Sequence, residues 1–216
     1  MNLPYGCDKM INIPKTTYAH KRVPKDAFYR HLSLDRRAKE RFVYEINTIY
    51  LENSLTKDRL HLTTDSEVQE ILLFSIHLRQ QDCSAGILEA IARQNPHKLV
   101  FLLCFEDQRQ LALYYGKLYR TAWVPEERLT LEVRGFSLTE VWEGFVEQVA
   151  LVEERVTGHE GLTMTQRLAL QEKILKLEKQ IQKTEASMWK EIQPKKRFAL
   201  HQKLMQLKRE LDEYRR

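Results

Sequence analysis

The sequence predicts an α+β protein, in which a small mixed β-sheet with flanking helices precedes a coiled-coil-like C-terminal helical hairpin. Three observations support this prediction. Short segments of alternating apolar residues recur between residues 68 and 124, as in β-strands. A helical pattern separates the first two of these segments, as in a strand–helix–strand unit. From Leu170 onward, apolar residues recur at alternating steps of four and three, as along the contact line of paired helices.

The composition suits one globular body with an extension. The 216 residues are 43% hydrophobic and 30% charged, and no apolar segment approaches the roughly 20 residues of a membrane span. The N-terminus lacks the apolar run of a secretory signal, so we expect a cytoplasmic protein. The three cysteines form no CxxC pair, and neither a disulfide framework nor a zinc site is expected. We divide the chain into an extended leader, a mixed α/β body, a linker and a basic two-helix arm, at residues 1–24, 25–156, 157–162 and 163–216.

Positive charge is concentrated in the arm. The net charge is +5, but residues 164–216 contain 14 Lys and Arg against 7 Asp and Glu, whereas the rest of the chain contains 21 against 23. A basic arm can contact nucleic acid or an acidic protein surface. Lysine and glutamate also fill the solvated side of helical pairs, so charge alone does not separate these alternatives.

The first predicted elements of the body are a helix and a strand–helix–strand unit. Apolar residues spaced three and four apart predict a helix over residues 35–53. Residues 68–78 predict a strand with apolar side chains on both faces, which indicates a central place in the sheet. A short helix over residues 84–94 and a buried strand over residues 99–105 follow. Such a unit favours parallel pairing of its two strands.

An antiparallel meander and another helix complete the body. A polar turn at residues 106–109 precedes strands over residues 110–115 and 119–124, which Gly116-Lys117 joins as a two-residue hairpin loop. A capping box at Ser137–Glu140 predicts the start of a helix, in which the serine and glutamate side chains each bond a backbone N–H.

The arm sequence predicts two helices that fold back on each other. A capping box at Thr163–Gln166 begins the first helix, which we expect to run from about Met164 to Glu191. Proline breaks a helix interior but is favoured in the first turn of a new helix, so Pro194 marks the reversal. The two apolar stripes then face each other, although pairing between two chains, as in a homodimer, would satisfy them almost as well. Their members are the candidate interface residues, Leu170, Ile174, Leu177, Ile181, Met188, Leu200, Leu204, Leu207 and Leu211.

The sequence contains no recognised catalytic motif. The chain lacks phosphate-binding glycine loops, HExxH and GxSxG, and its seven histidines have no metal-ligand spacing. We therefore expect no catalytic residue, no metal site and no cofactor. Glu70 and Glu106-Asp107 are the strongest carboxylates for a two-metal nuclease, although no ExK pattern follows on a neighbouring strand.

The end of the arm is the best candidate for binding nucleic acid. Lysine and arginine neutralise phosphates, and exposed aromatic rings stack on bases. The alternative is that the aromatic ring at position 198 only closes the end of the helical contact, with solvated lysines around it. The candidate residues are Trp189, Lys190, Lys195, Lys196, Arg197 and Phe198.

Four segments of the chain resemble a known family. They are VPKDAFYRHL (Val23–Leu32), VQEILLFSIHL (Val68–Leu78), ILEAIARQNPHKLVFLL (Ile87–Leu103) and RFALHQKLMQLKRELDEY (Arg197–Tyr214). These segments are similar to the bacterial family catalogued as domain of unknown function 4391, which typically has an acidic residue and a lysine where this chain has Ser75 and Arg79. Members of that family often lie beside genes for helicases and DNA methyltransferases of restriction-type defence, so the resemblance implies an accessory role, but it assigns no functional residues.

Together these observations predict a non-enzymatic accessory subunit of a prokaryotic DNA-processing or antiphage defence complex. The body would dock on a larger helicase, nuclease or methyltransferase, and the arm would brace the contact. Direct binding of DNA or RNA by the arm is the first alternative, and a cryptic metal-dependent nuclease is the second. No membrane partner is expected.

Overall fold

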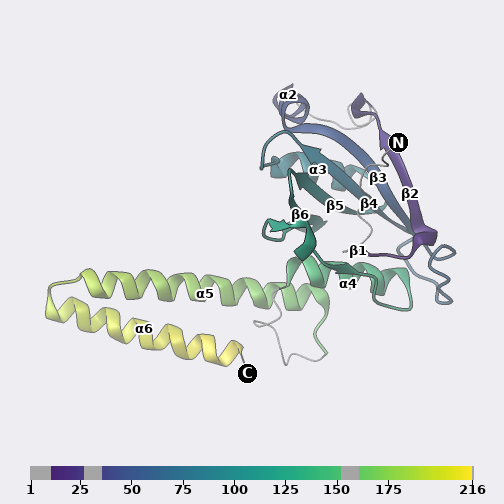
Figure 1. Ribbon diagram of the computed structural model, residues 1–216. Coiled ribbons are helices and arrows are strands. Elements are labelled where there is room, and N and C mark those ends of the chain that lie inside the picture. The colour runs from purple at the N-terminus through teal and green to yellow at the C-terminus, as the bar shows by residue number, and fades with distance from the viewer. Residues whose placement is uncertain (1–10, 27–35, 152–160, 216) are drawn as a thin grey trace. The chain divides into compact units, whose positions relative to one another are not determined.

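The computed structural model describes residues 11–26, 36–151 and 161–215 of the chain. The chain divides into two compact units, Met1–Ala150 and Leu151–Arg216, which we call the body and the arm. The body is built on a β-sheet and the arm on two helices (Figure 1). Most of the linker predicted at residues 157–162 lies outside the described residues, as do the first ten residues of the predicted leader.

A seven-stranded mixed sheet forms the framework of the body. The strands of the body are β1 Ile11–Asn12, β2 Tyr18–Val23, β3 Ile46–Thr56, β4 Glu70–Leu78, β5 Lys98–Phe105, β6 Gln108–Tyr115, β7 Lys117–Arg120, β8 Val124–Pro125 and β9 Leu131–Glu132. The seven-stranded sheet consists of strands β2 to β8, and β1 and β9 lie outside it. The order is β2-β3-β4-β5-β6-β7, with β8 also paired to β6, while β1 and β9 form a separate pair. Strands β4 and β5 are parallel, as the strand–helix–strand pattern predicts, and the other neighbours in the large sheet are antiparallel.

Helices flank the sheet and form the arm. They are α2 Arg36–Glu45, α3 Ala85–Gln94 and α4 Leu138–Ala150 in the body, and α5 Met164–Lys190 and α6 Pro194–Tyr214 in the arm. Short 3-10 turns lie at Lys15–Thr17 (η1) and Glu126–Arg128 (η2). The prediction of a mixed sheet with flanking helices and a C-terminal helical pair is therefore confirmed. Among the described residues, no helix is both long enough and apolar enough to cross a membrane.

The helix predicted over residues 35–53 is wrong beyond Glu45. From Ile46 the chain is extended and forms β3, which pairs with β2 on one side and β4 on the other. The second half of this segment is rich in β-branched and aromatic residues, which favour a strand over a helix. Part of the predicted leader is also regular, because β2 forms the edge of the sheet beside β3.

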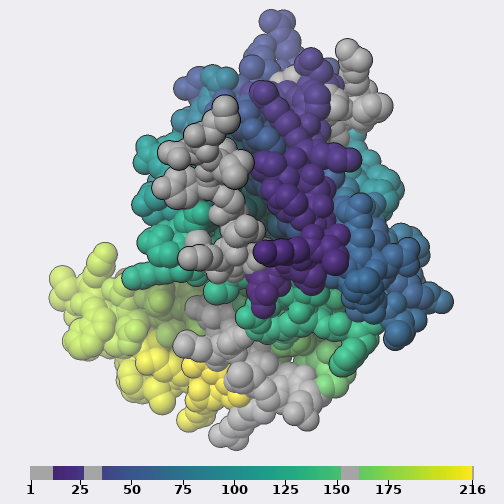
Figure 2. All heavy atoms as spheres, turned by 45° about the vertical axis from the view of Figure 1, so that its right-hand side comes forward, coloured from purple at the N-terminus to yellow at the C-terminus, as the bar shows by residue number. Residues whose placement is uncertain are grey.

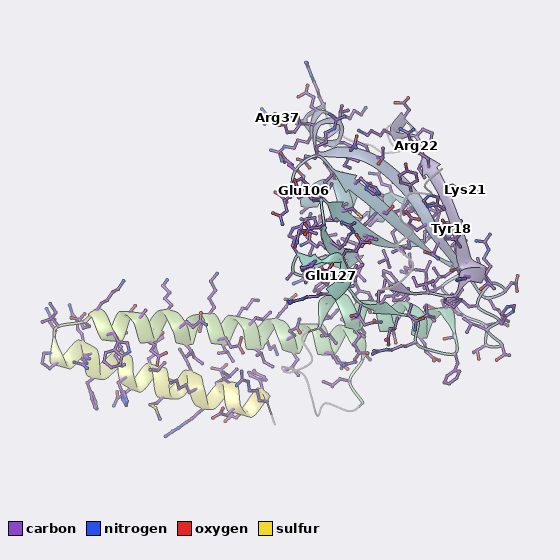
Figure 3. All side chains as sticks on the ribbon, viewed as in Figure 1. Tyr18, Lys21, Arg22, Arg37, Glu106 and Glu127 are labelled. Carbon is purple, nitrogen blue, oxygen red and sulfur yellow. The ribbon has the colours of Figure 1, made fainter. Side chains whose placement is uncertain are left out.

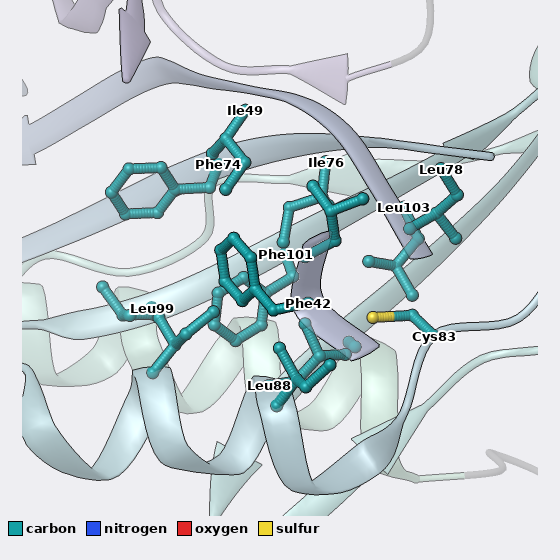
Figure 4. Close-up of a cluster of buried hydrophobic side chains, with 14 residues drawn as sticks. Phe42, Ile49, Phe74, Ile76, Leu78, Cys83, Leu88, Leu99, Phe101 and Leu103 are labelled. Atoms are coloured by element: carbon teal, nitrogen blue, oxygen red, sulfur yellow. The ribbon is translucent and has the colours of Figure 1, made fainter. Parts of the chain in front are cut away.

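One face of the sheet packs against α2 and α3. Phe42 of α2 and three side chains of α3 meet apolar residues from β3, β4, β5 and β6 in a single cluster, and Phe101 of β5 lies near its centre (Figure 4). The side chains of α3 in this cluster are those that the helical pattern predicts to face inward, Ile87, Leu88 and Ile91. Burial of this set supplies most of the hydrophobic stabilisation on this face.

The opposite face of the sheet is covered in part by α4. Apolar residues of β4, β5 and β6 that alternate with those of the first face are also buried, among them Leu73, Val100 and Leu113. The ammonium of Lys98, which points to this second face, lies 5.8 Å from the ring centroid of Trp142 in α4. The sheet is therefore buried on both faces at β4 and β5, as a central position requires.

Two predicted capping boxes have different outcomes. At the start of α5 both halves form, because Thr163 Oγ1 accepts from the backbone N–H of Gln166 and the Gln166 side chain accepts from the backbone of Thr163. At the start of α4, Ser137 Oγ accepts from the backbone N–H of Glu140 at 3.2 Å. The Glu140 carboxylate accepts instead from the N–H of Phe136, one residue before the expected donor.

The helix α3 is capped from a distant part of the sequence. Glu45, at the end of α2, is buried, and its carboxylate accepts from the N–H of Ser84 at 2.7 Å and from its hydroxyl at 2.6 Å. A carboxylate at a helix N-terminus satisfies a free N–H group and faces the positive end of the helix dipole. The contact therefore joins the end of α2 to the beginning of α3.

The two helices of the arm pack against each other as an antiparallel pair. Ile174, Leu177 and Ile181 of α5 form one buried cluster with Leu204, Leu207 and Leu211 of α6. Ion pairs join the outer sides of the pair, with Lys208 Nζ 3.7 Å from Glu185 and Arg215 donating to Glu178 at 2.8 Å. Pro194 occupies the first turn of α6, which confirms the predicted reversal.

Cys83, in the body core, should resist alkylation in the folded chain. Burial, and then the neighbouring Glu45 carboxylate, raise the pKa of the Cys83 thiol to about 12. The unfolded chain loses this proton near pH 9, so the Cys83 contribution to stability declines as pH rises above 9. We expect iodoacetamide followed by peptide mass spectrometry to label Cys83 only after denaturant is added. Rapid labelling of the native chain at neutral pH would contradict the buried position.

Candidate functional sites

The end of the arm exposes three large apolar side chains. Trp189, at the end of α5, is 71% exposed, Ile192 in the connection is 92% exposed, and Phe198 in the first turns of α6 is 62% exposed. We call residues 189–198 the tip. The wide exposure of Phe198 argues against the alternative in which its ring only closes the end of the helical contact.

Positive charge surrounds these apolar side chains. Lys190, Lys195, Lys196 and Arg197 are all exposed, and they share the tip with one carboxylate, Glu191. That carboxylate accepts from the backbone N–H of Gln193 at 2.9 Å. The tip is therefore an apolar surface with a basic rim, assembled from the facing ends of two helices.

One contact joins the two helices at the tip. The guanidinium of Arg197 on α6 lies 5.8 Å from the ring centroid of Trp189 on α5. A cation over the face of an indole ring is attracted by its negative π-surface. The structure thus brings together two candidate residues that belong to different helices, and their contact depends on the reversal before Pro194.

The candidate interface residues of the arm pack against one another within one chain. Six of them form the buried cluster between α5 and α6, and Leu170 and Met188 pack against it. Leu200 is half-buried. These side chains stabilise the helical pair and leave the tip as its most exposed apolar surface.

The carboxylates considered for a nuclease lie far apart. Glu70 begins β4, where it accepts a hydrogen bond from Ser54 Oγ and lies 3.5 Å from His97 Nε2. Glu106 and Asp107 form the loop after β5. Because β4 and β5 are parallel, the two groups lie at opposite ends of the sheet, about 30 Å apart at 3.3 Å per residue. One pair of metal ions cannot bridge that separation.

A polar cluster that the sequence alone does not predict lies on the second face of the sheet. The Glu52 carboxylate on β3 accepts from Ser75 Oγ at 2.5 Å and from His20 Nδ1 at 2.8 Å. His20 stacks on Tyr50 with ring centroids 5.3 Å apart, and Tyr50 meets His77 edge to face at 5.7 Å. In the sequence, the cluster is indicated only by Ser75 and His77, which alternate with buried apolar residues on β4.

The electrostatics of this cluster favour a structural role. Burial lowers the pKa of His77, nearby Arg109 lowers it further, and Glu52 and Glu126 oppose the shift, so the imidazole is neutral at pH 7. A neutral imidazole can accept a proton, but the Ser75 hydroxyl is directed to Glu52 and not to His77. In the part of the chain that the structure describes, no three His, Cys, Asp or Glu residues are grouped to hold a metal ion.

Comparison with known proteins identifies a family. Neither the curated proteins nor the solved structures contain a match to the chain. The model of one family, described as a domain of unknown function (DUF4391), matches residues 11–211, which include most of the body and the arm. A match over this length shows that the chain belongs to the DUF4391 family.

Proposed function

We propose that this protein is a non-enzymatic accessory subunit of a prokaryotic DNA-processing or antiphage defence complex. In this proposal the tip of the arm docks into a larger partner protein. The partner surface is an apolar pocket with acidic side chains at its rim. The exposure of Trp189, Ile192 and Phe198 within a ring of cations is the observation that carries the proposal.

The energetics of the tip support a binding role. Three large apolar side chains exposed together leave apolar surface in water, and burying that surface in a partner is favourable at about 25 cal/mol per Å². Aromatic anchors and arginine are also the residues that contribute most to protein interfaces. Lysines at the rim steer an acidic partner toward the apolar centre.

The aliphatic side chain at the centre of the tip favours a protein partner over nucleic acid. Ile192 is the most exposed of the three apolar residues, and an aliphatic chain has no π-face on which a base can stack. Trp189 and the lysines would suit either partner. Family members lie beside helicase and methyltransferase genes, which points to the class of protein to test first.

The experiment is co-expression with the products of the neighbouring genes, followed by titration calorimetry of the purified components. Replacing Trp189, Ile192 and Phe198 together with alanine should weaken the complex by about 30-fold or more, because buried anchors of this kind contribute about 2 kcal/mol or more. The side chains are exposed, so the helical pair should remain folded.

A matched control is available on the same two helices. Leu175 and Met205 are also exposed apolar residues, on α5 and α6 but away from the tip. Replacing both with alanine should change the affinity by less than about twofold. If the two variants lose affinity equally, or if the tip variant loses binding to DNA or to anionic vesicles instead of to a protein, the proposal is wrong.

A further inference from the structure

A cleft in the body is lined by cations. It has a volume of about 540 Å³ and lies where β2 ends beside the beginning of β3. Arg22, Lys25 and Arg79 line it, together with the uncharged residues Val23, Pro24, Asn47 and Thr48. No carboxylate occurs among these lining residues. Residues that are separated by more than fifty positions in the sequence therefore place three positive charges around one space.

Of the two acidic residues next to the cleft residues in the sequence, Asp26 is exposed to solvent and Glu45 is already occupied. Glu45 precedes the cleft residues of β3, but its carboxylate is bound to the N–H and hydroxyl of Ser84. Lys25 Nζ is held in the cleft by a hydrogen bond to the carbonyl oxygen of Ile46. Burial lowers the pKa of Lys25, and the charge of Arg79 lowers it further, as expected where cations crowd together.

Positive charge continues from the cleft along neighbouring elements. Lys21 precedes Arg22 on β2, the surface-exposed edge strand of the sheet, and its exposed side chain points to the opposite face of the strand (Figure 2). Helix α2, whose end is joined to Arg79 by a hydrogen bond from the Arg79 N–H to the Glu45 carbonyl, carries four further exposed cations. Arg22 and Arg37 lie toward the same end of the body, with Lys21 level with Glu106 and with Glu127 farther away (Figure 3). The cations on α2 are Arg36, Arg37, Lys39 and Arg41, of which Arg36 is paired with Glu40 at 3.0 Å.

We propose that this surface binds the phosphate backbone of a nucleic acid, with one phosphate in the cleft between Arg22, Lys25 and Arg79. A single small anion would contact only the three cations of the cleft and would not need the cations outside it. The exposed cations of α2, a helix about 15 Å long whose end is bonded to Arg79, match a ligand with repeating charges. Arginine also suits phosphate because its guanidinium donates two parallel hydrogen bonds. This surface belongs to the body and is separate from the tip, so it is a second binding site and does not rest on the function proposed for the arm.

The test uses the full chain and a labelled DNA duplex, with fluorescence anisotropy measured over a range of salt concentrations. The Arg22→Gln, Arg79→Gln double variant should reduce the affinity at moderate salt by about tenfold or more. It should also reduce the slope of log K against log salt by about one, because the two arginines together neutralise the one phosphate in the cleft. Both side chains are exposed, so folding should not depend on them, and thermal unfolding checks this.

A control pair removes the same charge elsewhere. Arg128 of η2 and Arg209 of α6 are exposed arginines outside the cleft, and their double change to glutamine should alter the affinity by less than about twofold. Equal weakening by the two pairs would show only a general effect of net charge and would overturn the proposal. The proposal also fails if the cleft pair binds DNA like the native chain.

Discussion

Replacing Phe101 with alanine should lower the free energy of unfolding of the body by about 3–5 kcal/mol. Phe101 is 1% exposed, at the centre of β5, and its ring lies in the cluster formed by the sheet with α2 and α3. Removing the ring loses its transfer free energy and leaves a cavity. The parallel neighbour β4 and the antiparallel neighbour β6 fix the backbone on both sides, so the site cannot collapse to fill the cavity.

Urea unfolding measured by tryptophan fluorescence tests this result. The measurement is made with Trp189 changed to phenylalanine, so that the signal comes from Trp123 and Trp142 of the body. Phe136 is 80% exposed and provides the control, since its change to alanine should alter stability by less than about 0.5 kcal/mol. Comparable losses for Phe101 and Phe136 would contradict the described core.

The sequence was sufficient to predict the central strands of the body, but not the end of its first helix. Strands β4 and β5 carry apolar residues on both faces over 9 and 8 residues. A short apolar run of this kind is typical of a central strand. Phe42, Ile46 and Ile49 fit a helical stripe, and all three do enter one cluster. Their spacing therefore predicts correctly that all three side chains are buried. The backbone, however, changes from helix at Phe42 to strand at Ile46.

The contacts that the sequence did not predict are those between distant segments. The reversal before Pro194 and the two stripes of the arm depend on local spacing, so both helices could be predicted, whereas their pairing within one chain rather than between two could not. The cap that Glu45 provides for Ser84 depends on how the sheet brings α2 to α3. The grouping of Arg22 with Arg79 likewise needs β2, β3 and β4 in their order, which periodicity along one chain does not contain.

Replacing Ile174 with aspartate should separate the two helices of the arm. Ile174 is completely buried in the cluster between α5 and α6, where an unpaired carboxylate has no compensating charge among the residues of that cluster. A two-helix pair has little stability in reserve, because each helix is covered along one side only. The 27 residues of α5 and the 21 residues of α6 should then lose much of their helical circular dichroism signal.

The neighbouring residue provides the control and separates charge from packing. Leu175 is 39% exposed, so an aspartate there remains hydrated, and the variant should keep the helical signal of the native chain. Both variants carry the same net charge, and both change a branched apolar residue of α5. Because Trp189 and Arg197 meet only when α5 and α6 are paired, the Ile174 variant should also lose the partner binding proposed for the tip, whereas the Leu175 variant should retain it. Equal behaviour of the two variants would mean that the pairing of α5 with α6 does not hold the tip together.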